Sequence, residues 1–186
     1  KEYKYKNIYF KTNIMNRKKL VVIFHGKASY DIYPVYRGYD YNFKDCNVLS
    51  ISDPLICKYK GLGIGWYLDT EKIDITNTII EIINEIKKFT GSDKILFTSQ
   101  CAGSMIAIRL ASIMKQYCLI TNPHIILKSE DLNYPHWWED SIKNGYIYNT
   151  YKNKVKILSS FLKDDNNHLI ENYQLDSRRV IEKYDF

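Results

Sequence analysis

Short runs of apolar residues, rich in β-branched side chains, recur along the chain between turn residues. Each run is continuous rather than alternating, which is typical of strands buried on both faces of a parallel sheet. An earlier segment, Lys4–Lys11, alternates instead and predicts one half-exposed strand. The runs that predict buried strands are Leu20–Phe24, Val48–Ile51, Ile95–Phe97, Tyr117–Thr121 and Val155–Phe161.

Helical patterns lie between these runs. Over residues 74–89 the isoleucines fall on one side of a helix and the charged residues on the other, and Gly91 follows as a C-terminal cap. A second apolar helix spans Met105–Ile113, and the tail Leu169–Phe186 is mostly helical. Alternating strands and helices predict an α/β fold, with a mostly parallel sheet flanked by helices.

Composition places the chain among ordinary folded proteins. A length of 186 residues argues for one domain over residues 1–186, and 45% hydrophobic with 26% charged residues excludes wholesale disorder. No run of about 18 apolar residues predicts a membrane span, and no signal peptide pattern is visible. The four cysteines lack metal-ligand spacing, so we expect reduced thiols in a cytoplasmic protein without a metal or other cofactor.

The charge and glycine patterns exclude two binding functions. The net charge is +6 and the chain has 17 tyrosines, but no basic stripe is concentrated on one element, so nucleic acid is not an expected partner. Gly61, Gly63 and Gly65 do not lie directly between a strand and a helix, as a dinucleotide-binding loop requires. We interpret them as a loop that lets Trp66 and Tyr67 pack near the site.

The junction at Ser99–Gly103 is the most informative segment. A strand that turns into a helix on small residues, with the spacing small-x-nucleophile-x-Gly, is a nucleophile elbow, and Cys101 stands at the nucleophile position. The positive end of the following helix favours a thiolate there, and the Ala102 amide is placed to stabilise an oxyanion. The alternative interpretation of Cys101 is a small core residue at a helix start.

A second loop predicts the rest of the oxyanion hole. His25-Gly26 follows the first buried strand, where a hydrolase sheet supplies its second oxyanion amide, here from Gly26 or Lys27. A turn glycine after a strand is the alternative. We expect His25, Gln100 and Trp66 to contact the substrate.

Acid and base candidates come late in the chain. Asp164 and Asp165 directly follow the last predicted strand, where an acid that orients a histidine is expected, and His168 follows closely. Solvated carboxylates and a surface histidine are the alternatives. The order nucleophile, acid, histidine is the chain order of α/β-hydrolases.

Several segments together resemble α/β-hydrolase-like proteins, and more closely a bacterial group associated with surface polysaccharide and glycan biosynthesis. The resemblance implies ester hydrolysis or O-acetylation of a glycan, with an acyl donor in the second case. The segments are LVVIFHG (Leu20–Gly26), NVLSISDP (Asn47–Pro54), GWYLDT (Gly65–Thr70), ILFTSQCAG (Ile95–Gly103), TNP (Thr121–Pro123) and DNNH (Asp165–His168).

The chain departs from that group in two ways. The group's elbow reads Gly-x-Ser-x-Gly-Gly, whereas here Ser99, Cys101 and Ser104 replace the first glycine, the serine and the last glycine. The thiol keeps a nucleophile, as in dienelactone-hydrolase-like enzymes, but changes the intermediate to a thioester.

The second departure concerns the histidine, which in an α/β-hydrolase normally follows one more strand beyond the acid. No clear sixth apolar strand follows His168, so we expect a fold that is minimal or truncated at its C-terminus. Either His168 serves from the same loop as Asp165, or the histidine lies outside this sequence. His136, beside Trp137-Trp138, is a third candidate and fits better in an aromatic cap over the pocket.

The leading hypothesis is an acyl-transfer enzyme, either an esterase or an O-acetyltransferase. Cys101 attacks the acyl carbon, His168 is the general base and then acid, and Asp165 or Asp164 orients the imidazole. The competing hypothesis is a non-catalytic α/β-hydrolase relative that serves as a binding or scaffold subunit in glycan biosynthesis. The oligomeric state stays open.

Overall fold

The computed structural model describes residues 1–123 except 42, 59–62 and 71. The strand predicted at Val155–Phe161 and the helix predicted at Leu169–Phe186 lie outside the described residues. The strands are β1 (Glu2–Tyr5), β2 (Ile8–Asn13), β3 (Lys19–Phe24), β4 (Cys46–Ile51), β5 (Lys94–Cys101) and β6 (Tyr117–Pro123). The helices are η1 (Tyr30–Ile32), α1 (Pro54–Lys58), α2 (Ile75–Thr90) and α3 (Ser104–Met114).

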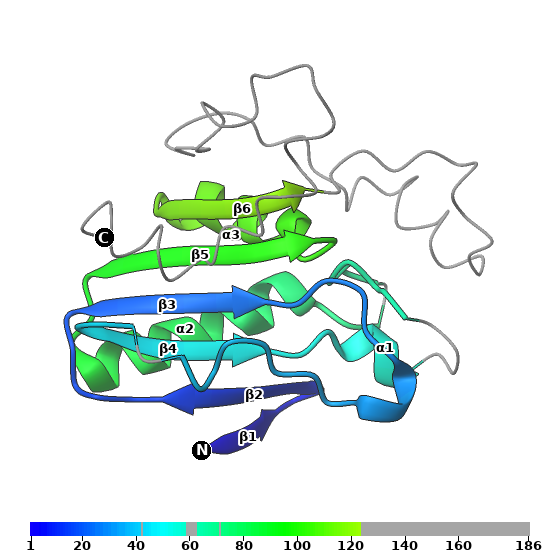
Figure 1. Ribbon diagram of the computed structural model, residues 1–186, viewed down its shortest axis with the longest axis horizontal. Coiled ribbons are helices and arrows are strands. Elements are labelled where there is room, and N and C mark those ends of the chain that lie inside the picture. The colour runs from blue at the N-terminus through cyan, green and yellow to red at the C-terminus, as the bar shows by residue number, and fades with distance from the viewer. Residues whose placement is uncertain (42, 59–62, 71, 124–186) are drawn as a thin grey trace.

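The strands form one sheet in the order β1-β2-β4-β3-β5-β6. Strands β4, β3, β5 and β6 pair in parallel, whereas β2 is antiparallel to both of its neighbours. In Figure 1 the arrowheads of the four parallel strands therefore end at one edge, and that of β2 points the other way. This mixed sheet, flanked by helices, confirms the predicted fold class, an α/β-hydrolase-like architecture.

The central strand β3 explains why its sequence is continuously apolar. Leu20, Val22 and Phe24 belong to a core shared with α2 and α3, which lie together behind the sheet in Figure 1. Val21 and Ile23 point to the opposite face. Because successive residues of a strand point to opposite faces, a strand covered on both sides must be apolar at every position.

The opposite face of the sheet is covered by a loop rather than by a described helix. Phe43 is buried against Val21, Ile23 and Val48, and Tyr41 packs beside it with ring centroids 5.8 Å apart. The segment between β3 and β4 thus contributes the short η1 and this aromatic cover, and its Ala28 and Val35 pack against Ile56 of α1.

The predicted helix at 74–89 is α2, with the capping that its sequence indicates. The Asp74 carboxylate accepts a hydrogen bond from the Asn77 amide at 2.9 Å and thereby caps the first turn. At the other end Gly91 has φ 66° and its amide donates to the Lys87 carbonyl at 2.8 Å. These two caps set the ends of the helix within a residue of the prediction.

One strand prediction was wrong in detail. The segment Lys4–Lys11 is not a single strand but the hairpin of β1 and β2, because Lys6 has φ 51° and reverses the chain. None of the helices in the described part of the chain has the length and hydrophobicity that a bilayer-spanning helix needs.

Candidate active site

Cys101 ends β5 in the backbone conformation of a nucleophile elbow. Its φ is 56°, in the left-handed region that L-residues rarely adopt, and α3 begins at Ser104. The pairing of β5 with β6 shifts register at this point: Gln100 pairs with Thr121, whereas Cys101 pairs with Pro123, so the ladder is irregular where the elbow begins. The Cys101 side chain is partly exposed, unlike the buried positions on either side of the elbow at Ser99 and Ala102.

Two glycines allow the elbow to lie against the end of β3. A methyl group added at Gly103 would lie 2.6 Å from the His25 carbonyl oxygen, and one added at Gly26 would lie 3.1 Å from Cys101 Cβ. Any larger residue at Gly103 would therefore separate the two segments. Ser99 is also small, and its buried hydroxyl donates a hydrogen bond to Ser104 Oγ at 3.2 Å. This bond joins the end of β5 to the start of α3.

The two backbone amides predicted to form the oxyanion hole belong to the segments that meet here. Lys27 follows Gly26, and Ala102 follows Cys101. Within the described residues neither of these amides donates a hydrogen bond to another part of the chain. Most backbone amides are occupied by protein acceptors, so two amides without one in the described part of the chain, close to a partly exposed sulfur, fit the oxyanion hole that the sequence predicts.

His25 is buried, with 3% of its surface exposed, and both nitrogens of its ring are engaged within the protein. The Asp53 amide donates to Nε2 at 3.0 Å, and Nδ1 lies 2.7 Å from the Gly26 carbonyl oxygen. Burial lowers the pKa of His25 to about 4, so the ring is neutral at pH 7. The ring thus faces the protein's own backbone rather than an open substrate position.

Asp53 organises the next loop with a carboxylate that sequence analysis did not single out. It is fully buried, and it accepts hydrogen bonds from the amides of Leu55 at 3.0 Å, Gly65 at 3.0 Å and Tyr67 at 3.2 Å. Burial raises the pKa of Asp53 to about 6, against the opposite effect of these three donors. A methyl group at Gly65 would lie 2.8 Å from this carboxylate, so only glycine fits there.

Tyr67 joins the ends of β3 and β4 through its hydroxyl group. That hydroxyl accepts a hydrogen bond from the His25 amide at 3.1 Å and donates to the Ile51 carbonyl at 2.8 Å. Trp66 and Tyr67 are both buried and both have φ 52°. Both aromatic residues therefore pack in the core next to Gly65, as interpreted from the sequence, whereas Gly61 lies outside the described residues. Trp66, a predicted substrate contact, is only 4% exposed.

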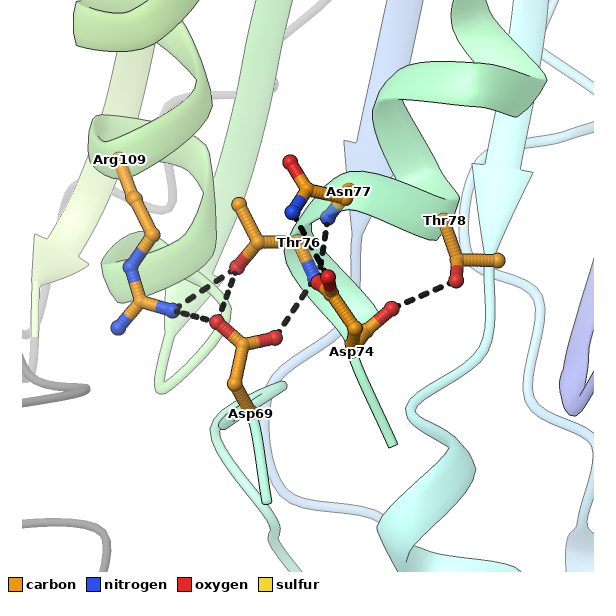
Figure 2. Close-up of polar contacts among 6 residues, drawn as sticks. All are labelled: Asp69, Asp74, Thr76, Asn77, Thr78 and Arg109. Atoms are coloured by element: carbon orange, nitrogen blue, oxygen red, sulfur yellow. Dashed lines mark hydrogen bonds and ion pairs between the residues drawn. The ribbon is translucent and has the colours of Figure 1, made fainter. Parts of the chain in front are cut away.

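An ion pair between the buried Arg109 and the partly exposed Asp69 ties the elbow helix α3 to the start of α2. Arg109 Nη1 donates to Asp69 Oδ2 at 3.1 Å and to Thr76 Oγ1 at 3.0 Å. Asp69 also accepts from the Thr76 amide at 2.7 Å, so the carboxylate links α3 to the first turn of α2. Figure 2 shows Arg109 reaching from one helix to this cluster beside the Asp74 cap of the other. The Asp69 carboxylate belongs to the GWYLDT segment, which sequence analysis linked to the family but not to a partner on α3.

The described residues thus bring together Cys101, Ala102, Gly26 and Lys27, with Gln100 exposed at the end of β5. The predicted acid and base residues Asp164, Asp165 and His168, and the alternative His136, lie outside the described residues. The four cysteines are free thiols, of which Cys46 and Cys118 are buried and Cys57 is exposed.

Comparisons with known proteins find similar folds among solved structures. No protein-family model and no curated protein matches the sequence. Among solved structures, the chain is similar to the Glycosylation Associate Protein (Gap123) complex from Streptococcus agalactiae, with 17% identity and a TM-score of 0.54 over 76% of this chain and 27% of that chain. It is also similar to the capsule O-acetyltransferase of Neisseria meningitidis serogroup A, with 19% identity and a TM-score of 0.50 over 66% of this chain and 51% of that chain.

These similarities concern the fold. The chain spans about a quarter and about half of the lengths of the two proteins that it matches. The sheet order, the left-handed residue at the end of β5 and the glycine contact with the loop after β3 agree with one another. The protein has an α/β-hydrolase-like fold, and Cys101 lies at the end of β5 directly before the turn into α3.

Proposed function

We propose that the protein is an acyl-transfer enzyme in which Cys101 is the nucleophile. The observation that carries this proposal is the backbone of Cys101, held at φ 56° with its side chain partly exposed and in contact with the Gly26 loop. A strained turn of this kind costs stability and does not improve packing. Its benefit is that it presents one side chain above the carboxyl edge of the sheet.

The proposed reaction proceeds through a covalent intermediate on Cys101. The Cys101 thiolate attacks the carbonyl carbon of an ester, and the amides of Ala102 and Lys27 stabilise the tetrahedral oxyanion. The alcohol leaves with a proton from the general acid, and a thioester remains on Cys101. Attack on the thioester by water completes ester hydrolysis, whereas attack by a sugar hydroxyl completes O-acetyl transfer.

The substrate that we propose is an acyl ester on a sugar or glycan. Support comes from the resemblance of the LVVIFHG, GWYLDT and ILFTSQCAG segments to glycan-biosynthesis hydrolases, and from the similarity of fold to a capsule O-acetyltransferase. The residues described here do not discriminate between water and a sugar hydroxyl as the acceptor, so both reactions belong to the proposal.

His168 is the proposed general base, oriented by Asp165 or Asp164. Removing a general base lowers the rate by about 100-fold to 10,000-fold, so His168→Gln should lower the rate of Cys101 acetylation by p-nitrophenyl acetate to that extent. His136→Gln is the matched control and should retain the rate. Asp165→Asn and Asp164→Asn then identify the acid, because only one of them should slow acetylation. Equal rates in His168→Gln and the wild type would remove His168 from the reaction.

Alkylation with iodoacetamide tests whether Cys101 is activated. Exposure alone predicts that Cys57, which is more exposed, reacts faster than Cys101. We expect the reverse at neutral pH, with Cys101 modified at least about tenfold faster, because the thiolate is the reactive form. Mass spectrometry of the separate peptides measures both rates in one sample. A faster reaction at Cys57 would contradict activation of Cys101.

The second candidate function is a non-catalytic subunit of a glycan-assembly complex. The similarity to the Gap123 complex, a glycosylation-associated assembly, favours it. In this case Cys101 would label no faster than Cys57, and Cys101→Ala would leave the biological function intact. The alkylation experiment therefore separates the two candidates.

A further inference from the structure

The hydrogen bonds of His25 fix which of its ring nitrogens carries the proton. The Asp53 amide can only donate, so Nε2, at 3.0 Å, must be the acceptor and carries no hydrogen. The proton of the neutral ring is therefore on Nδ1, from which it is donated to the Gly26 carbonyl oxygen at 2.7 Å. His25 is thus the Nδ1–H tautomer, selected by a backbone amide from the end of β4.

This bond sets the direction of the peptide that joins Gly26 to Lys27. In a trans peptide the carbonyl and the amide point in opposite directions. Holding the Gly26 oxygen toward the ring therefore turns the Lys27 amide away from it. Gly26 is the residue of this loop that lies against Cys101, since a Cβ added to it would be 3.1 Å from Cys101 Cβ.

The ring that holds this peptide cannot itself rotate freely. It is 3% exposed and lies against the Tyr67 ring, with centroids 5.5 Å apart. The His25 amide is bound by the Tyr67 hydroxyl, and the Asp53 carboxylate holds the Tyr67 amide. Asp53, His25 and Tyr67 thus form a buried support, and the hydrogen bond from the His25 ring to the Gly26 carbonyl links it to the peptide that precedes Lys27.

We infer that His25 is a positioning residue for acyl transfer: as the Nδ1–H tautomer it holds the Gly26–Lys27 peptide so that the Lys27 amide stabilises the oxyanion. This inference rests on the proposed function and gives His25 a role different from substrate contact. His25 touches no reacting atom and acts only through the peptide.

Two substitutions of His25 each remove one of the two hydrogen bonds that its ring makes. The amide nitrogen of Asn lies close to the place of Nδ1, so His25→Asn keeps the donor to the Gly26 carbonyl and loses the acceptor for the Asp53 amide. The longer side chain in His25→Gln reaches the place of Nε2, so it keeps that acceptor and loses the donor. Both variants lose one buried hydrogen bond, so a purely structural role predicts similar effects of the two.

The experiment measures two reactions of Cys101 in each protein. Acetylation by p-nitrophenyl acetate passes through an oxyanion, whereas alkylation by iodoacetamide displaces iodide at a saturated carbon and forms none. Because losing one oxyanion donor lowers rates by about 100-fold to 1,000-fold, misorienting it in His25→Gln should slow acetylation at least about tenfold. Alkylation should be unchanged, and His25→Asn should recover most of the acetylation rate. Protection of the buried Cys118 thiol shows that each variant is folded.

Nitrogen-15 NMR of the ring tests the tautomer without any activity. The wild type should show a protonated Nδ1 and an unprotonated Nε2 at pH 7, and the Lys27 amide resonance should move in His25→Gln more than in His25→Asn. A protonated Nε2, or equal acetylation rates in the two variants, would overturn the inference alone. A wild-type Cys101 that takes up no acetyl group would instead contradict the proposed function, and with it the catalytic role of His25.

Discussion

At the scale of single residues, Cys101 adopts a conformation that glycine adopts more readily than any side chain does. An L-residue in the left-handed region costs about 1–2 kcal/mol of stability, a cost that glycine avoids. Glycine loses more chain entropy on folding, which offsets part of this advantage. We therefore expect Cys101→Gly to be more stable than Cys101→Ala by about 0.5–1 kcal/mol in denaturant unfolding. Neither variant should be acetylated.

Cys118 provides the matched control for this comparison. It lies in β6, an extended strand, where glycine has no conformational advantage. There the order should reverse, with Cys118→Gly less stable than Cys118→Ala by about 0.5–1 kcal/mol. The same order at both positions would contradict the strained elbow.

His25 should make stability depend on pH in a defined window. Its pKa is about 4 in the folded protein, whereas an unfolded histidine titrates near its ordinary value of 6.5. Between these values the unfolded chain binds the extra proton, so the stability contributed by neutral His25 is complete above pH 6.5 and is lost as the pH falls toward 4. The wild type should thus lose about 3 kcal/mol relative to His25→Gln across this window.

Comparing the two proteins isolates His25 from its neighbour Asp53. The raised pKa of Asp53 acts in the opposite direction, because the folded protein binds the extra proton there, but the group is present in both proteins and its effect cancels in the difference. Chemical denaturation at several pH values measures the difference. A constant difference between pH 7 and 4 would contradict a buried, neutral ring.

The residue scale also shows what a sequence pattern can and cannot reveal. The elbow was predictable because its requirement for small residues is local and is met by Ser99, Ala102 and Gly103. The support of the Gly26 loop was not, because the Asp53 amide donates to the distant His25 ring and the Tyr67 hydroxyl accepts from the distant His25 amide. The Asp-Pro pair after Ser52 was the only local signal, and it is equally typical of an ordinary turn.

At the scale of elements, the contact between the start of α3 and the end of β3 decides the geometry of the site. Gly103→Ala places a methyl group 2.6 Å from the His25 carbonyl oxygen, and relief of that overlap requires the two backbones to separate. We expect a loss of about 1–3 kcal/mol in the free energy of unfolding, together with a changed alkylation rate at Cys101.

Gly91→Ala is the control at a different helix end. A methyl group there meets only the end of the Lys18 side chain at 3.4 Å, so its effect comes from the φ of 66°. It should cost about 1 kcal/mol and leave alkylation of Cys101 unchanged. If both variants changed Cys101 equally, the contact at Gly103 would have no special relation to the site.

The brace between α3 and α2 gives a second prediction at this scale. Arg109→Met removes the buried guanidinium from the partly exposed Asp69 carboxylate, which keeps its hydrogen bonds from Thr76, and we expect a loss of about 1–3 kcal/mol in the free energy of unfolding. Arg17→Met removes an exposed ion pair with Asp45 at 3.7 Å and should cost less than about 1 kcal/mol. Similar losses in the two variants would contradict the structural role of the pair between Arg109 and Asp69.

The helices and strands were more predictable from the sequence than the side-chain contacts that join them. The ends of α2 follow from Asp74 and Gly91, which act within one turn of the helix, so the sequence was sufficient. The ion pair of Arg109 with Asp69 joins segments far apart in the chain, and no periodicity indicates such a pairing. The hairpin of β1 and β2 was missed because an unfavourable φ at Lys6, rather than glycine or proline, makes its turn.

At the scale of the whole molecule, the sheet order brings the two halves of the candidate site together. β3 and β5 are neighbours in the sheet although about seventy residues separate them in the chain, and both end at the same edge. The loop after β3 therefore lies beside the elbow at the end of β5, although no sequence motif links the two segments. This placement was predictable from the fold class, because parallel strands end at a common edge.

The remaining part of the proposed reaction is carried by residues beyond β6. Asp164, Asp165 and His168 are proposals from chain order, and substitution rather than geometry tests them. The chain also covers only part of the length of the proteins that it matches, so hydrolysis and transfer must be distinguished by experiment.

Trapping the acyl-enzyme tests the central claim most directly. The protein is mixed with p-nitrophenyl acetate, quenched in acid at short times and digested, and the acetyl group is located by mass spectrometry. We predict an acetyl group on Cys101 that forms with the burst of p-nitrophenol and then decays, and none on the exposed Cys57. Equal acetylation of Cys57 and Cys101, or a burst that persists in Cys101→Ala, would contradict the account.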